Sequence, residues 1–133
     1  MATPSVELQT AIYDALVANA GVAAVVAGRI FDGLPTDYPA ISFGPSNVIP
    51  DDMDGIAARV EYLQLDCWAE GGKRLRPARE LADLVKASLH LKELHLGTHA
   101  LAKLQVSSVR VFMDPDGLTG HGVVTLEALV EER

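Results

Sequence analysis

Four histidines are the side chains in this sequence that most readily bind a metal ion or transfer a proton. His95 and His99 lie four positions apart, and this spacing brings two imidazole rings to one metal only on a helix. Gly97-Thr98 lies between them, and glycine disfavours a helix. We therefore predict no metal site, and we expect these two histidines, with His90 and His121, to be turn residues that face solvent.

Two short acidic turns resemble parts of a calcium-binding loop. They are Asp52-Met53-Asp54-Gly55 and Asp114-Pro115-Asp116-Gly117. Neither has the third oxygen ligand before the glycine, nor the glutamate that closes such a loop at the required spacing. Ordinary turn chemistry explains both segments, because proline presets φ and glycine accepts a positive φ. No calcium site is predicted.

Two further features could serve an enzyme, but each lacks the residues that its chemistry needs. A phosphate-binding loop at Gly71-Gly72-Lys73 would need a glycine where Cys67 stands, and Ser or Thr where Arg74 stands. A nucleophilic Cys67 would need a base and an electropositive setting, whereas its neighbours include Asp66 and Glu70. We expect a strand-to-helix turn and a buried strand cysteine. With no G-x-S-x-G elbow either, the sequence predicts no enzyme and no cofactor.

Charged residues gather in two segments. The basic segment contains four of the 11 basic residues, and the acidic segment contains three aspartates close together: Lys73, Arg74, Arg76 and Arg79; Asp51, Asp52 and Asp54. One interpretation is a solvated helix start and a solvated loop. The other is a pair of complementary patches that meet across a subunit interface. Basic residues at a helix N-terminus oppose the helix dipole, which favours a compensating partner. We take these seven residues as candidates for a subunit or lumen interface.

Length and composition restrict the class of protein. The 133 residues suit a single domain over residues 1–133, and 49% hydrophobic residues supply a core. With 18 acidic and 11 basic residues the net charge is −7, which disfavours autonomous binding to nucleic acid or to an anionic membrane. The longest apolar run, residues 22–27, is far shorter than the roughly 20 residues of a membrane span. A single cysteine and no signal-peptide pattern are typical of a cytoplasmic protein.

The first half of the chain predicts one helix and several strands. Thr3 as N-cap, Pro4 at the first helical position and a period of apolar residues predict a helix over residues 4–20, ending at Gly21. Residues 22–27 are expected to form a short helical turn or a buried connector. Short strands are expected at residues 29–32 and 40–44, followed by a mobile, exposed loop at residues 45–57. A long strand with two mixed faces is expected at residues 59–68.

The second half predicts a helix and then a hairpin. Apolar residues from Ala78 to Leu89 line one face of a helix at about residues 76–91, with Pro77 in its first turn. Alternation predicts two strands in a hairpin at residues 101–131, with its turn at residues 114–117. This order of elements argues for an α+β fold. We expect a mainly antiparallel sheet of about four to five strands, with two amphipathic helices packed on it.

The ordered set of segments resembles a known family. After the first helix come Gly28-Arg29-Ile30-Phe31-Asp32, then Tyr38-Pro39-Ala40-Ile41-Ser42-Phe43-Gly44, then the strand 61–68, a helix that ends in Ala87-Ser88-Leu89-His90, and a hairpin with Met113-Asp114-Pro115-Asp116-Gly117 at its turn. In this order they resemble the small tail-terminator, or tail completion, proteins of long-tailed bacteriophages, prophages and gene transfer agents. The resemblance covers about residues 5–131.

The resemblance implies a structural virion protein without catalysis. Such proteins form a ring, usually a hexamer, that caps the tail tube, ends tail polymerisation and joins the tail to the head connector. The implied partners are other copies of the chain, the major tail tube protein and the head-side connector or stopper. DNA would pass through the lumen without specific binding, and an acidic lining would repel the duplex and let it slide. The implied locations are the bacterial host cytoplasm during assembly and the neck of the virion afterwards.

Two alternatives stay open from the sequence. One is a head-side stopper or adaptor of the same neck assembly, which would bind the portal-side ring instead of the tube. The other is a non-enzymatic α+β domain that binds a small ligand in a regulatory role, which would show a saturable thermal shift with a metabolite. Self-association into a ring favours the terminator over the regulatory domain.

Overall fold

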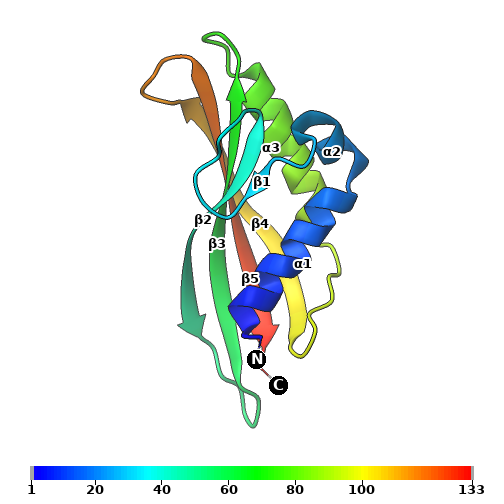
Figure 1. Ribbon diagram of the computed structural model, residues 1–133. Helices are drawn as coiled ribbons and strands as arrows, with labels where there is room; N and C mark the ends of the chain where they lie inside the picture. Colours follow the sequence, from blue (N-terminus) through cyan, green and yellow to red (C-terminus); the bar gives the residue numbers. More distant parts are fainter. Residues whose placement is uncertain (1, 133) are drawn as a thin grey trace.

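The computed structural model describes residues 2–132 and contains three helices and five strands in that range (Figure 1). In chain order they are α1 (Pro4–Ala18), α2 (Ala20–Val26), β1 (Ile30–Phe31), β2 (Ala40–Pro50), β3 (Ala58–Glu70), α3 (Arg76–Leu89), β4 (Ala100–Met113) and β5 (Thr119–Glu131). The predicted α+β class, with helices packed on a mainly antiparallel sheet, is confirmed. The described residues contain three helices where two were predicted.

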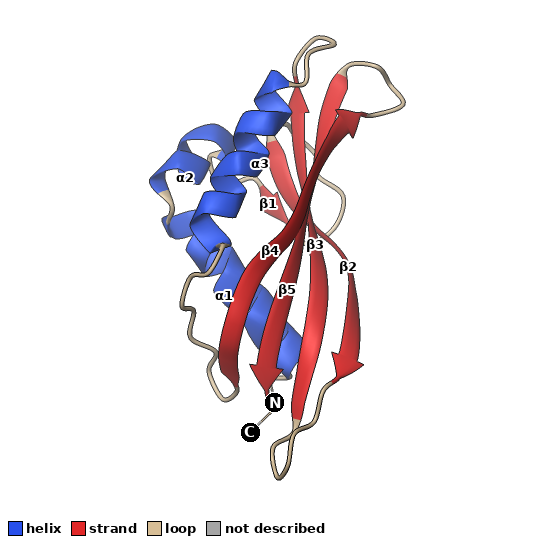
Figure 2. Cartoon of the chain, turned by 180° about the vertical axis from the view of Figure 1, so that it is seen from behind, coloured by secondary structure: helices blue, strands red, loops and turns tan. Residues whose placement is uncertain are grey.

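All five strands form one sheet in the order β1-β2-β3-β5-β4. β1 pairs with β2 in parallel, and the other three pairings are antiparallel. The three helices lie on one face of this sheet, and the other face is left open (Figure 2). Side chains at alternate positions of β5 from Val124 to Val130 are buried under the helices, whereas their neighbours are only half buried on the open face.

The N-terminal helical region bends where one helix was expected. α1 ends at Ala18 because Asn19 has extended backbone angles, and the Asn19 side chain accepts a hydrogen bond from the Val22 amide at 3.0 Å. Asn19 therefore ends α1 and caps α2. The prediction that Gly21 ends the first helix is wrong, since Gly21 lies inside α2. A Cβ at Gly21 would stand 2.8 Å from Cδ2 of Leu84, so glycine allows α2 to approach α3.

α3 has the predicted start and ends two residues earlier than predicted. Pro77 occupies the first turn, and the predicted apolar face, from Ala78 to Leu89, is buried against the sheet. The helix stops at Leu89 because His90 is extended and Leu91 is in the left-handed region, with φ 57°. The chain then runs beside β4, where the Leu91 amide donates to the Leu104 carbonyl.

The loop predicted for residues 45–57 is wrong over its first half. Residues 45–50 belong to β2, which continues to pair with β3 as far as Pro50 and Arg59. Pro45 and Pro50 are the residues that favour a loop in the sequence. They are tolerated because β1 covers β2 only at Ile41 and Ser42, so the outer edge of β2 has no ladder that needs their missing N–H groups.

The long strand and the C-terminal hairpin are confirmed, with longer strands than predicted. β3 extends over Ala58–Glu70 and pairs along its whole length with β5. β4 and β5 form the hairpin around a turn in which Asp116 accepts hydrogen bonds from the Leu118 amide and from the amide and hydroxyl of Thr119. These three bonds hold the pKa of Asp116 below its ordinary value.

The core lies between the helices and the covered face of the sheet. It is made of aliphatic side chains, and its largest fully buried members are Leu8, Ile12, Leu16, Ile41, Leu65, Leu81, Leu89, Leu104, Leu126, Val22, Val26 and Val85. Leucine, valine and isoleucine thus form most of the core in a sequence with only 5% aromatic residues. Within residues 2–132 no single helix has the length and apolar character of a membrane span. α1 and α2 pass that test only when joined, and they meet at 86°.

Candidate functional site

The acidic segment forms an arm at one end of the sheet, made of residues 51–57. The Met53 and Ile56 backbones exchange two hydrogen bonds of 2.9 and 2.8 Å, and Gly55 has the positive φ, 73°, that this tight turn requires. At its base Asp52 accepts a hydrogen bond from the Ala58 amide at 3.0 Å. The side chains of Met53 and Ile56 are about half exposed. The arm therefore presents apolar and acidic groups together.

The basic segment lies at the turn into α3. Arg74 donates to the Gly71 carbonyl at 3.2 Å, and Arg76 forms an exposed ion pair with Glu80 at 2.9 Å, one turn along the helix. Lys73, in the left-handed region, and Arg79 are exposed, and their side chains have no partner among residues 2–132. Glu80 therefore balances part of the positive charge at the N-terminal end of α3, where basic residues oppose the helix dipole.

The structure places these two segments at opposite ends of the molecule. Figure 1 shows the loop between β2 and β3, which carries Asp51, Asp52 and Asp54, at the lower end of the sheet, and the turn between β3 and α3 at the upper end. They do not meet within one chain. They would face each other only where the lower end of one copy met the upper end of another.

A row of stacked rings crosses the open face of the sheet near its upper end. The ring of His121 stacks on Trp68, with centroids 3.9 Å apart, and meets Phe112 at 4.8 Å. His121 Nε2 lies 2.7 Å from Asp66, and the Trp68 indole donates to the Ser42 hydroxyl at 3.0 Å. The prediction that His121 is a turn residue facing solvent is wrong, because it lies within β5 and is largely covered by this packing.

Two other histidines are also engaged by the fold. His90 Nδ1 accepts a hydrogen bond from the Val106 amide at 2.9 Å, and His99 Nδ1 lies 2.9 Å from the Glu7 carboxylate. Their expected exposure is therefore wrong, and His95 alone among the four histidines is exposed. In the part of the chain that the structure describes, no group of three or more His, Cys, Asp or Glu residues is placed to hold a metal ion.

Glu7 is a carboxylate with several hydrogen-bond partners, and the sequence alone gives no sign of this cluster. It accepts hydrogen bonds from the Thr98 amide at 2.9 Å and the Thr98 hydroxyl at 2.7 Å, as well as from the His99 amide and ring. The Thr98 amide bond, followed by the His99 and Thr98 side chains, lowers the pKa of Glu7 from 4.5 to about 2. The cluster fastens the N-terminal end of α1 to the segment before β4. Its partners are 91 and 92 residues away, so no local pattern signals it.

The nucleophile-like residues are also structural. Cys67 is fully buried, as predicted, and burial, with the nearby charge of Asp66, raises the pKa of its thiol. Asp66 and His121 form a pair, but among residues 2–132 no serine hydroxyl is hydrogen-bonded to His121. Ser42 instead accepts its bond from Trp68. This arrangement packs a sheet face and has no activated nucleophile.

Comparison with known proteins gives a family and a fold. The family described as Tail completion protein gp17 matches residues 10–131. A chain in the solved structure titled "Virion of native gene transfer agent (GTA) particle" is similar, with a TM-score of 0.85 and 23% sequence identity. The alignment covers 94% of this chain and 95% of that chain. No curated protein sequence matches this chain.

Proposed function

Because the chain belongs to the tail completion protein gp17 family, whose members are structural proteins and not enzymes, we propose that it forms a ring that caps the tail tube, ends tail polymerisation and joins the tail to the head connector. The observation that carries this proposal is the extent of the family match. Residues 10–131 include all five strands, α2, α3 and all but the first residues of α1. The proposed role therefore belongs to the fold as a whole.

The proposed ring is a hexamer of this chain, the single domain of residues 1–133. Its axial partners are the major tail tube protein on one side and the head-side connector or stopper on the other. The two charged ends support two different axial partners, because the acidic arm with Asp51, Asp52 and Asp54 lies opposite the end with Lys73, Arg74, Arg76 and Arg79. We assign these seven residues to the end surfaces of the ring and to the rims of its lumen.

The net charge supports passage of DNA through the ring without specific binding. At −7 per chain, a ring of identical subunits repels the phosphate backbone, so a duplex slides instead of adhering. We place the protein in the bacterial host cytoplasm during assembly and then in the neck of a phage or gene transfer agent particle. The similarity of fold to a chain in a gene transfer agent virion supports this location.

The experiment is to mix the purified protein with tail tube subunits and to examine the tubes by electron microscopy. The proposal predicts a ring at one end of each tube and shorter tubes as more protein is added. Native mass spectrometry should detect a species of about 85 kDa, six times the 14.2 kDa chain, alone or with tube subunits. A protein that stays monomeric and binds neither tube nor connector contradicts the proposal. Binding to the connector without any effect on tubes would identify a stopper or adaptor instead.

A further inference from the structure

We infer that neighbouring copies in the ring meet through two unlike flanks of the molecule, the outer side of α1 on one copy and the outer edge of β4 on the next. This inference rests on the proposed ring and specifies its subunit interface. The α1 flank is made of Val6, Tyr13, Asp14, Val17, Asp32 and Phe43. The β4 flank is made of Leu91, Lys92, Leu101, Lys103 and Val109.

α1 has an apolar stripe on the side that faces away from the core. Its inner side buries Leu8, Ile12 and Leu16 completely, yet Val6, Tyr13 and Val17 follow the helical period on the outer side. These three are 57%, 41% and 47% exposed. A helix that is apolar on both sides is normally covered on both sides. The single chain leaves the second side uncovered.

A hollow beside this stripe adds shape and charge. A depression of about 230 Å³ lies between α1 and the β1–β2 edge and is lined by Gln9, Thr10, Tyr13, Ile30, Asp32 and Phe43. Asp14 and Asp32 are exposed, and among residues 2–132 neither carboxylate has a hydrogen bond or an ion pair. The nearby cation Arg29 is already engaged, since it donates to the Pro39 and Val25 carbonyls. The α1 flank is therefore apolar and acidic.

The β4 flank has the opposite charge. A second depression, of about 190 Å³, is lined by Leu91, Lys92, Glu93, Leu101, Ala102, Lys103 and Leu104. Leu91 is 61% exposed, and Val109 further along β4 is also exposed. Lys92 and Lys103 are exposed without a side-chain partner in the described residues, and Glu93 is the one acidic residue in the lining. Apolar contact can thus combine with opposite charges when one flank meets the other.

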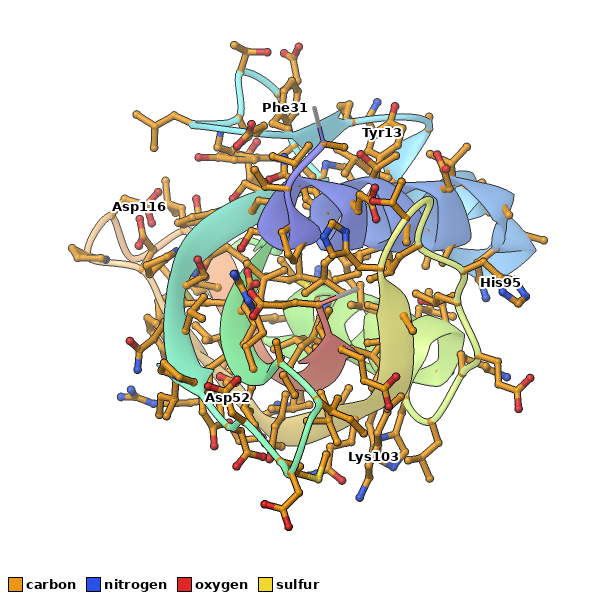
Figure 3. The ribbon with its side chains drawn as sticks, turned by 90° about the horizontal axis from the view of Figure 1, so that it is seen from below. Tyr13, Phe31, Asp52, His95, Lys103 and Asp116 are labelled. Carbon is orange, nitrogen blue, oxygen red and sulfur yellow. The ribbon has the colours of Figure 1, made fainter. Side chains whose placement is uncertain are left out.

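The two flanks lie where a closed ring needs them. β1 and β4 are the two edges of the sheet, and Figure 3 shows Tyr13 and Phe31 on one side of the molecule and Lys103 on the opposite side. A cyclic ring joins each subunit to the next by two different patches. A second copy of the chain is therefore the occupant that both flanks fit.

The edges themselves are poorly suited to joining copies by strand pairing. β4 has two irregularities, between Leu101 and Lys103 and between Val106 and Ser108, and His90 and Leu91 occupy its outer hydrogen-bonding groups near Leu104. The free edge of β2 contains Pro45 and Pro50. Bulges and prolines at an edge oppose further pairing. Contact through side chains is the remaining mode for these flanks.

Charge reversal on each flank tests the inference. Variant A, Asp14→Lys with Asp32→Lys, has two basic flanks, and variant B, Lys92→Asp with Lys103→Asp, has two acidic flanks. Each variant alone repels itself, so we expect loss of the ring species by native mass spectrometry, with tube subunits present. Mixed together, A and B attract at both junctions and should restore a ring of alternating A and B. A chain with all four changes should form the ring alone.

Matched controls separate this interface from a general effect of charge. Glu80→Lys with Asp83→Lys changes the charge as much as A, and Lys86→Asp changes it half as much as B, in both cases on the outer side of α3; both control variants should form rings. Circular dichroism and thermal unfolding verify that every variant is folded. If folded A and B assemble as the natural chain does, or if mixing them restores nothing, the flank assignment is overturned while the ring proposal stands. A natural chain that forms no ring, alone or on tubes, overturns both.

Discussion

α1 and α3 pack against the same sheet, yet their outer sides differ. α3 places only charged side chains and alanine at its exposed positions, including Arg76, Arg79, Glu80, Asp83 and Lys86. α1 exposes Val6, Tyr13 and Val17 and one charged residue, Asp14. A charged outer side is stable against water, whereas an exposed apolar stripe marks an interaction surface. In a single chain, the apolar side chains of α3 are therefore covered by the core, whereas α1 keeps apolar side chains exposed to water.

The largest loss of stability should come from substitutions on the buried sides of α1 and α3, where the two helices are alike. Leu16 in α1 and Leu81 in α3 are both fully buried in the same core. Replacing either by alanine leaves a cavity and should lower the free energy of unfolding by about 2–5 kcal/mol. Urea unfolding of the monomer measures this loss. A much smaller loss for Leu16→Ala than for Leu81→Ala would contradict the view that α1 belongs to the core.

A smaller loss is expected where α3 approaches β5. A Cβ at Gly120 would stand 2.8 Å from the Ala78 Cβ, and neither atom can move by rotating a side chain. Gly120→Ala should therefore cost about 1–3 kcal/mol, the usual range for overpacking, in thermal unfolding. Gly21→Ala is the matched variant. Its obstacles are side-chain ends, Cδ2 of Leu84 at 2.8 Å and Oδ1 of Asn19 at 3.3 Å, and alanine favours a helix by up to about 1 kcal/mol, so its net effect should be smaller.

The anchoring of α1 should make stability depend on acid. Hydrogen bonds from Thr98 and His99 lower the pKa of Glu7 from 4.5 to about 2, so the folded state favours the ionised form. The Glu7 contribution is complete above pH 4.5 and is lost as the pH falls toward 2. Urea unfolding at several pH values should show a weaker dependence across this window for Glu7→Gln. By comparison, the exposed Arg76–Glu80 ion pair in α3 should contribute only about 0.3–0.5 kcal/mol to the free energy of unfolding. An unchanged dependence in Glu7→Gln would show that the cluster does not anchor α1.

Substitutions on the outer sides of α1 and α3 should change stability least, and they should differ most in their effect on assembly. Val17→Lys in α1 and Asp83→Lys in α3 each place a lysine at an exposed helical position. Each should change the free energy of unfolding by less than about 0.5 kcal/mol. Sedimentation with tube subunits should then show that Val17→Lys prevents assembly and Asp83→Lys does not. Equal assembly of the two variants would remove the distinction between the helices.

The parts of the fold that local patterns determine were predictable. α3 and β5 were predicted because a period of apolar residues fixes which side is buried. The break at Asn19 was not, because the apolar pattern continues into α2 and the break depends on one side-chain hydrogen bond to Val22. Residues 45–50 resemble a loop in the sequence, because the tolerance of a strand for proline depends on whether its edge is paired, which is a property of the whole sheet.

The candidate surfaces were predictable as groups of residues but not in space. The sequence shows that Asp51, Asp52 and Asp54 are close together, and that Lys73, Arg74, Arg76 and Arg79 are as well, because neighbours in the chain stay neighbours in the fold. Their placement at opposite ends depends on the path of β3 between them. The exposure of Tyr13 and Val17 likewise depends on where the sheet ends beside α1. The residue types around an apolar side chain on a helix do not show whether that side chain will be exposed.

An electron cryo-microscopy reconstruction of the ring, alone or on tail tubes, tests the account most directly, through what covers Tyr13 and Val17. We expect both to be buried against β4 of the next copy, near Leu91 and Lys103, while Asp83 and Lys86 on α3 stay in solvent. A ring in which the outer side of α1 faces solvent, or in which β4 contacts something other than α1 of the neighbour, would contradict it.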